Sequence, residues 1–121
     1  MKSRLGLLIA LVAFLLVPAC SSDKSASGKR VIAVIPKGTT HEFWKSIHAG
    51  AKVAADELGV EIIWKGPLRE DDRNEQIKVV ENFNTRRVDG IVLAPLDETA
   101  LVKVCQESAD LGIPVVIVDS G

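Results

Sequence analysis

The chain has 121 residues, enough for one modest domain at most. Its 15 Lys and Arg residues nearly balance its 16 Asp and Glu residues, and the formal net charge is -1. This balance argues against a nucleic-acid-binding protein, because such a protein needs a basic face.

The first residues, MKSRLGLLIALVAFLLVPAC, have the pattern of an export signal. Two basic residues precede an apolar stretch at 5–17, which is shorter than the roughly 20 residues of a membrane-spanning helix. The ending VPAC resembles the lipobox of bacterial lipoproteins, which implies lipid attachment at Cys20 and a membrane anchor. An ordinary cleavage site near Ala19 and an uncleaved anchor are the alternatives. We expect a signal peptide at 1–19 and a lipid-anchored protein in the periplasm or on the cell-envelope surface.

Residues 20–30, CSSDKSASGKR, are small and polar after the cysteine, which predicts a flexible tether. The second cysteine, Cys105, lies on an apolar helical stripe with Leu101 and Val104. We expect its thiol to be buried and inert.

The chain after the tether opens with a strand and a long helix. Residues 31–35 form a continuous apolar run, which predicts a strand covered on both faces. Residues 41–58 have helical spacing and Gly59 ends the helix. The apolar positions of this helix are Phe43, Ile47, Ala51, Ala54 and Leu58.

The remaining sequence continues the alternation of strands and helices. Asp71 and Asp72 offer a cap to a second helix, whose apolar side carries Ile77, Val80 and Phe83. The other expected elements are strands at 60–64, 88–93 and 114–118 and a helix at 97–111. This order, βαβαβαβ, predicts an α/β fold with a doubly wound parallel sheet and an apolar last strand at its edge.

Sheets of this kind bind ligands beyond the carboxyl ends of their strands. The rule selects the segments 37–44, 65–68, 94–98 and 119–121. They contain no complete phosphate loop, no GxGxxG turn and no Gly-x-Ser-x-Gly elbow. His41 and His48 have no cysteine or acidic neighbour at metal-ligand spacing. We therefore expect no catalytic residues, no cofactor and no metal.

The polar and aromatic residues in these segments suit a polyhydroxylated ring. Phe43 and Trp44 are consecutive, so on a helix they point about 100° apart. One can enter the core with Ile47 while the other faces the crevice and stacks on a sugar. Asp119 can accept hydrogen bonds from ring hydroxyls. The alternatives are that both aromatics are core or staple residues at the start of the helix and that Asp119 is a turn or cap residue.

Three stretches resemble the amino-terminal lobe of periplasmic sugar-binding proteins of the ribose, galactose and arabinose type. They are HEFWKSIHAGAKVAADELGV, NEQIKVVENFNTRRVDGIVLAPLDETAL and GIPVVIVDSG. In that family two α/β lobes joined by a hinge close over a sugar and present it to an ABC importer or a chemoreceptor. The resemblance implies that residues 31–121 form part of one such lobe, and that the chain is a fragment or a truncated product.

The resemblance also implies a ligand-binding set. Phe43 and Trp44 match aromatics that sandwich the sugar, His41 and Lys37 match polar residues that contact it, and Asp119 matches an aspartate that holds ring hydroxyls. Ser120 stands where ribose-type members commonly have arginine. The implied set is Lys37, His41, Phe43, Trp44, Asp119 and Ser120.

The expected function is that of an exported, non-enzymatic binding protein for a sugar or similar polyol, with an ABC permease as partner. The alternatives are a sensory component that works with a chemoreceptor or sensor kinase, and an exported α/β enzyme that uses His41, Asp97 and Asp119. A repressor of the lactose-repressor type is disfavoured, because the export signal stands where a DNA-binding headpiece would be.

Overall fold

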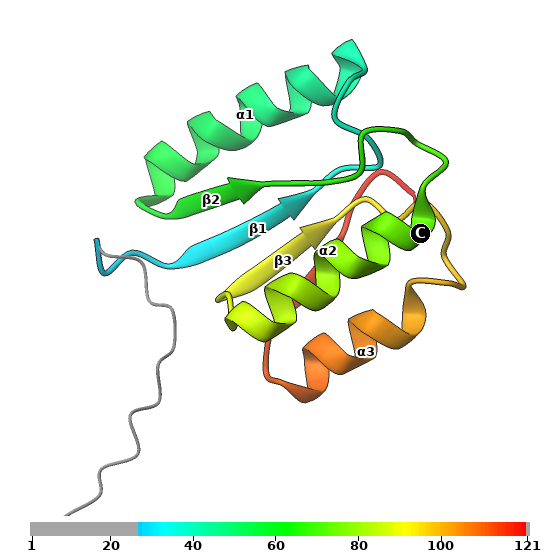
Figure 1. Cartoon of the computed structure of the whole chain (residues 1–121). Coiled ribbons are helices and arrows are strands. Elements are labelled where there is room, and N and C mark those ends of the chain that lie inside the picture. Colours follow the sequence, from blue (N-terminus) through cyan, green and yellow to red (C-terminus); the bar gives the residue numbers. More distant parts are fainter. Residues whose placement is uncertain (1–26, 121) are drawn as a thin grey trace, which may run out of the picture.

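The computed structural model describes residues 27–120, in which strands and helices alternate along the chain (Figure 1). The elements are β1 (Val31–Ile35), α1 (Glu42–Leu58), β2 (Glu61–Trp64), α2 (Arg73–Arg86), β3 (Gly90–Leu93), α3 (Val102–Asp110) and β4 (Val115–Ile117). Among the described residues, no helix is both long enough and apolar enough to span a bilayer. The predicted signal peptide, Cys20 and the tether residues 20–26 lie outside the described residues.

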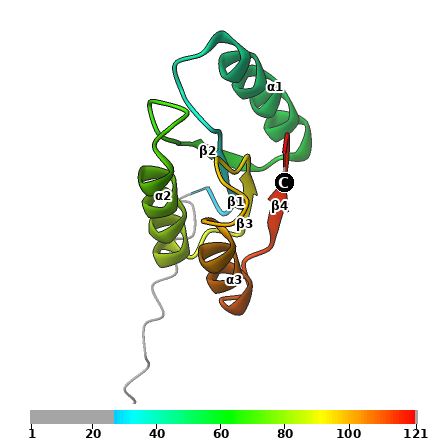
Figure 2. The same cartoon turned by 90° about the vertical axis from the view of Figure 1, so that its right-hand side faces the viewer.

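The strands form a four-stranded parallel sheet in the order β2-β1-β3-β4. Helices α2 and α3 pack together on one face of the sheet, and α1 lies over β2 on the other face (Figure 2). The doubly wound parallel sheet predicted from the sequence is confirmed, and β4 lies at its edge as expected. The carboxyl ends of β1, β3 and β4 are in register, since Ile35 pairs with Leu93 and Leu93 with Ile117. The loops that follow these strands therefore meet at one edge.

The hydrophobic core lies between the sheet and the α2–α3 pair. Its fully buried members include Ala33 and Ile35 from β1, Ile91 and Leu93 from β3, and Phe83 from α2. The opposite face of β1 is only half-buried. The expectation that β1 is covered on both faces is therefore wrong among the described residues, because α1 stands over β2 and leaves much of the neighbouring sheet surface open.

Side-chain and glycine caps define the ends of the first two helices. His41 is the N-cap of α1, and its Nδ1 accepts a hydrogen bond from the Phe43 N–H at 3.2 Å. Gly59 ends α1 with a φ of 66°, a left-handed conformation that favours glycine. Asp72 caps α2, where its Oδ1 accepts from the Glu75 N–H at 2.9 Å. The predicted stop at Gly59 and the predicted aspartate cap are both confirmed.

The third helix begins later than the sequence pattern predicts. The expected range was 97–111, whereas α3 starts at Val102. Asp97 Oδ1 accepts hydrogen bonds from the N–H groups of Thr99 and Ala100 at 2.9 and 2.7 Å. Together with the bond from the Leu101 N–H to the Asp97 carbonyl at 3.2 Å, these bonds cap a separate turn that begins at Asp97. The Val102 N–H then donates to the Thr99 carbonyl at 3.3 Å, a tighter turn than that of an α-helix, and the regular helix begins at Val102.

Candidate ligand-binding site

An ion pair joins the loops after β1 and β4 at the carboxyl edge. Lys37 Nζ lies 2.7 Å from Asp119 Oδ2 and also donates a hydrogen bond to Ser120 Oγ. Because β3 separates β1 from β4, the lysine side chain bridges over the loop that follows β3. Both charged side chains remain partly exposed, and each can form further hydrogen bonds. Three of the predicted residues therefore converge on one point.

Asp119 lies in a tight turn rather than in the strand. Its φ is 68°, a left-handed conformation that aspartate tolerates better than most residues. The turn is held by Val118, whose N–H donates to the Leu93 carbonyl and whose carbonyl accepts from the Ser120 N–H. This geometry turns the Asp119 carboxylate back toward Lys37. The alternative of a plain turn residue is thus partly right, because Asp119 is a turn residue that also forms the ion pair.

A second carboxylate, Asp97, lies in the loop after β3. Its Oδ2 accepts from Arg73 Nη1 at 3.0 Å. The Ala100 N–H is the main cause of a lowered Asp97 pKa, and Arg73 and the Thr99 N–H lower this pKa further. A shallow polar pocket is shared by Asp97, Thr99, Lys37 and Ser120. From the sequence, Asp97 is predicted only as part of the enzyme alternative and not as a ligand-binding residue. Its position directly after the third strand is the sequence signal that could have placed it at this edge.

The two adjacent aromatics have different environments. Trp44 is 4% exposed, and its Nε1 donates to Glu70 Oε1 at 2.8 Å. Phe43 is 48% exposed, and its ring meets the indole edge-to-face at a centroid distance of 4.9 Å. The pair is therefore split as expected, with Trp44 as the buried member, and the alternative that both are core residues is wrong. Stacking of either ring on a sugar stays a prediction.

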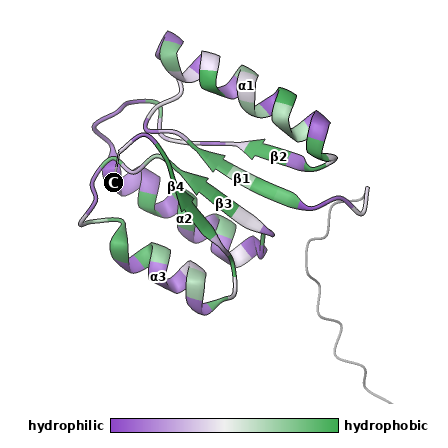
Figure 3. Cartoon of the chain, turned by 180° about the vertical axis from the view of Figure 1, so that it is seen from behind, coloured by the Kyte–Doolittle hydropathy of each residue, from purple (hydrophilic) through white to green (hydrophobic). Residues whose placement is uncertain are grey.

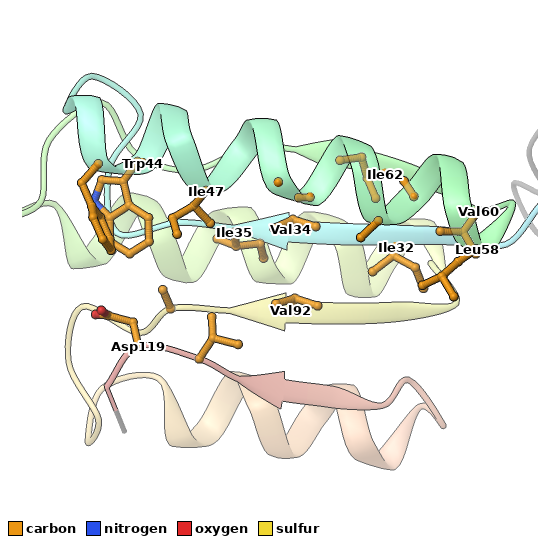
Figure 4. A pocket seen from close by; sticks show the side chains of 17 residues that line it. Ile32, Val34, Ile35, Trp44, Ile47, Leu58, Val60, Ile62, Val92 and Asp119 are labelled. Carbon is orange, nitrogen blue, oxygen red and sulfur yellow. The ribbon is translucent and has the colours of Figure 1, made fainter.

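An apolar groove of about 580 Å³ runs between α1 and the open face of the sheet (Figure 4). Trp44 and Asp119 stand at the same end of the groove, while Leu58 and Val60 stand at the other. From this side no helix of residues 27–120 covers the hydrophobic strands β3 and β4 (Figure 3). Among the described residues that line the groove, Asp119 is the one with a charged side chain.

The expected core role of Ile47 is wrong. Its side chain is 41% exposed and lines this groove, together with Phe43, Ala51 and Leu58 from the same apolar stripe. The helical period correctly predicts that these residues share one face of α1, but that face meets open sheet surface instead of a packed layer. The buried residues of α1 are Trp44 and Ala55.

The other predicted residues lie apart from the ion pair. His41 uses Nδ1 in the cap of α1, so a ligand could be reached only through its Nε2. The His48 ring stacks on Trp64 at a centroid distance of 4.5 Å, and burial is the main cause of its lowered pKa. Cys105 is half-buried, not fully buried as expected, and burial raises the pKa of its thiol. Within residues 27–120, no group of three or more His, Cys, Asp or Glu side chains could hold a metal ion.

Comparisons with known proteins agree with this architecture. Residues 32–121 match the family model described as periplasmic binding protein domain. The D-ribose/D-allose-binding protein of Pseudomonas aeruginosa is 34% identical over 119 residues, which cover 91% of this chain and 37% of that protein. This chain therefore spans 37% of the length of that relative.

Solved structures of solute-binding proteins share the fold. One from Agrobacterium radiobacter, in complex with D-arabinose, has a TM-score of 0.74 and 35% identity, over 77% of this chain and 31% of that one. One from Actinobacillus succinogenes, with bound D-allose, has a TM-score of 0.73 and 28% identity, over 75% of this chain and 32% of that one. The family match at residues 32–121 includes the elements that carry the Lys37–Asp119 edge.

Proposed function

The chain belongs to the periplasmic binding protein domain family, and from this premise we propose that it recognises a sugar or similar polyol as an exported solute-binding protein. The observation that carries the proposal is the Lys37–Asp119–Ser120 cluster beside the aromatic end of the groove. One relative is named for binding D-ribose and D-allose, and the two solved structures contain bound D-allose and D-arabinose, which supports a hydroxyl-rich ligand.

The chemistry of the cluster fits such a ligand. An ammonium group donates, a carboxylate accepts and a serine hydroxyl does both, so adjacent ring hydroxyls can be matched in either sense. Phe43 offers an exposed ring in the groove that Asp119 also lines, and the apolar face of a sugar could rest on it. Binding without turnover is the proposed activity, since the relatives above are named as binding proteins.

The proposed setting follows from the sequence. A signal peptide at 1–19 would deliver the protein to the periplasm, and a lipid on Cys20 would anchor it to a membrane. An ABC transporter permease is the proposed partner. A chemoreceptor or sensor kinase is the alternative partner, and it would use the same ligand site.

Titration with D-allose, D-ribose and D-arabinose, followed by NMR of the backbone amides, tests the proposal. Residues 27–120 alone offer an open edge that can bury little of a ligand compared with the roughly 70–90% typical of pockets, so for this segment by itself we expect a Kd weaker than about 1 mM. The largest shifts should fall on Lys37, Phe43 and Ser120. Asp119→Asn should weaken binding about tenfold or more, because a charged acceptor is lost.

Asp110→Asn provides a matched control. Asp110 is an exposed aspartate at the end of α3, and its carboxylate accepts from Gln106 at 2.9 Å. This variant removes the same charge away from the candidate site and should bind as the wild type does. Equal weakening in both variants, or shifts confined to residues away from the carboxyl edge, would refute the proposed site.

A further inference from the structure

Gln76 is a fully buried polar residue of α2, and within the described part of the chain its side chain bonds only to backbone groups of two loops. It is 0% exposed. Its Nε2 donates to the carbonyls of Pro36 and Ala94 at 3.0 and 2.9 Å, and its Oε1 accepts from the Leu96 N–H at 2.8 Å. Because carbonyls can only accept and an N–H can only donate, these partners allow a single orientation of the amide. Both donors of the amide are therefore committed.

The partners of Gln76 stand where the β1–β3 ladder ends. The Ala94 N–H donates to the Ile35 carbonyl at 2.9 Å. The next residue of the β1 chain is Pro36, which has no N–H and cannot continue the ladder. Without Gln76, the carbonyls of Pro36 and Ala94 would be buried without a hydrogen-bond donor, at a considerable cost in stability. The Gln76 amide supplies both donors, so it links the chain after β1 to the chain after β3 where the backbone pairing of these strands ends.

Pro36 is also held from the side of β2. A Cβ added to Gly66 would lie 2.8 Å from the Pro36 carbonyl oxygen, so the loop after β2 packs tightly on the same group. Lys37 therefore leaves the sheet from a point fixed by both Gly66 and Gln76. On the other side, Leu96 directly precedes Asp97 in the loop after β3.

The start of α2 contacts the loop after β3 at two points. On the exposed side, Arg73 pairs with Asp97 at 3.0 Å. On the buried side, Gln76, three residues further along the helix, bonds to Leu96. We propose that Gln76 is a positioning residue of the candidate ligand site. Its amide fixes the spacing between the loop that carries Lys37 and the loop that carries Asp97. Its effect on ligand binding rests on the proposed function, whereas its effect on loop spacing is independent of any ligand.

Gln76→Leu, compared with Asn84→Leu, tests the proposal. Asn84 is a buried amide of the same helix, but it bonds to the Val104 carbonyl and the Ser108 hydroxyl of α3, away from the carboxyl edge. Both variants should lower Tm. Only Gln76→Leu should displace the amide resonances of Lys37 and Asp97 and speed the hydrogen exchange of the Leu96 amide. It should also weaken D-allose binding about tenfold, the change expected when hydrogen bonds that order a site are lost.

Gln76→Glu tests the hydrogen bonds without a large change in shape. A protonated carboxyl group can still donate to one carbonyl and accept from the Leu96 N–H, whereas a carboxylate would face two carbonyl oxygens. Burial should raise the pKa of this carboxyl above about 4.3. Relative to wild type at the same pH, the Lys37 and Asp97 resonances should be nearly normal below that raised pKa and displaced above it.

The outcomes separate the two proposals. If Gln76→Leu lowers Tm but, like Asn84→Leu, does not displace the Lys37 and Asp97 resonances, Gln76 only fills the core and the positioning role is refuted. If Gln76→Leu does not fold, the pH dependence of Gln76→Glu decides, and its absence refutes the role. If the wild type does not bind D-allose, D-ribose or D-arabinose, the proposed function fails, while the ligand-free resonances still report on the loops.

Discussion

Trp44 should be the main anchor of α1, and Trp44→Ala should destabilise the fold far more than Phe43→Ala. The indole is 4% exposed and donates to Glu70, and Ala55 is the other buried residue of this helix. Removing a buried tryptophan typically costs about 3–5 kcal/mol. The ring lies beside an open groove, where neighbours can relax into the space, so we expect a value near the lower end, about 3 kcal/mol. Phe43 is 48% exposed, and its truncation should cost about 1 kcal/mol.

Urea unfolding followed by far-UV circular dichroism measures both changes. Trp44→Phe isolates the hydrogen bond to Glu70, since it keeps an aromatic ring and removes the indole N–H. It should cost about 1 kcal/mol more than the loss of ring area alone, the net value of a typical hydrogen bond. If Trp44→Ala costs no more than Phe43→Ala, then Trp44 does not anchor α1 and the inference from burial is wrong.

Further predictions concern the groove, the loss of stability at acid pH and the membrane anchor. Ile47→Ala should change the free energy of unfolding by less than about 1 kcal/mol, because Ile47 is largely exposed. Ile47→Lys should reduce the binding of an apolar dye to the groove. Val53→Lys, which changes an exposed residue of α1 outside the groove, should reduce this binding less. The Ala100 N–H lowers the pKa of Asp97, so the stabilisation from Asp97 should be present above its unfolded pKa of about 3.9 and be lost as pH falls through its folded pKa. In urea titrations at a series of acid pH values, Asp97→Asn should reduce the fall of stability with decreasing pH. An unchanged fall would contradict the assignment. Labelled palmitate should appear on the wild-type protein and be absent from Cys20→Ala, and label that persists in the variant would rule out this attachment site.

The order of elements and the class of sheet could be predicted because local patterns encode them. Apolar runs, helical periods and the cap at Asp72 each depend on residues within a few positions. The environment of Ile47 could not be predicted, since the period shows which residues share a face but not what covers that face. The start of α3 was also missed, because Asp97 caps a separate turn before the helix, and a helical period that continues through this turn does not reveal the break.

The convergence of Lys37 and Asp119 followed from a topological rule, since the loops after parallel strands meet at one edge. Gln76 was missed because a polar residue in a helix is usually assigned to the solvent face. One signal was present in the sequence. Gln76 precedes Val79, Val80 and Phe83 by three, four and seven positions, which places it on the apolar stripe of its helix. An amide on such a stripe has to find partners inside the protein, and here they are the loops of the candidate site.

The candidate site joins two parts of the fold that should differ in local stability. Lys37 and Asp119 extend from a sheet that α2 and α3 cover, and Gln76 holds the loops above it. Phe43 belongs to α1, whose apolar stripe lies largely open and whose main anchor is Trp44. Local opening is easiest where few apolar contacts are buried, so α1 should exchange its amides faster than α2. A ligand that bridges Phe43 and Asp119 would have to order α1 on binding, so weakening the Trp44 anchor should lower affinity even if the indole never touches the ligand.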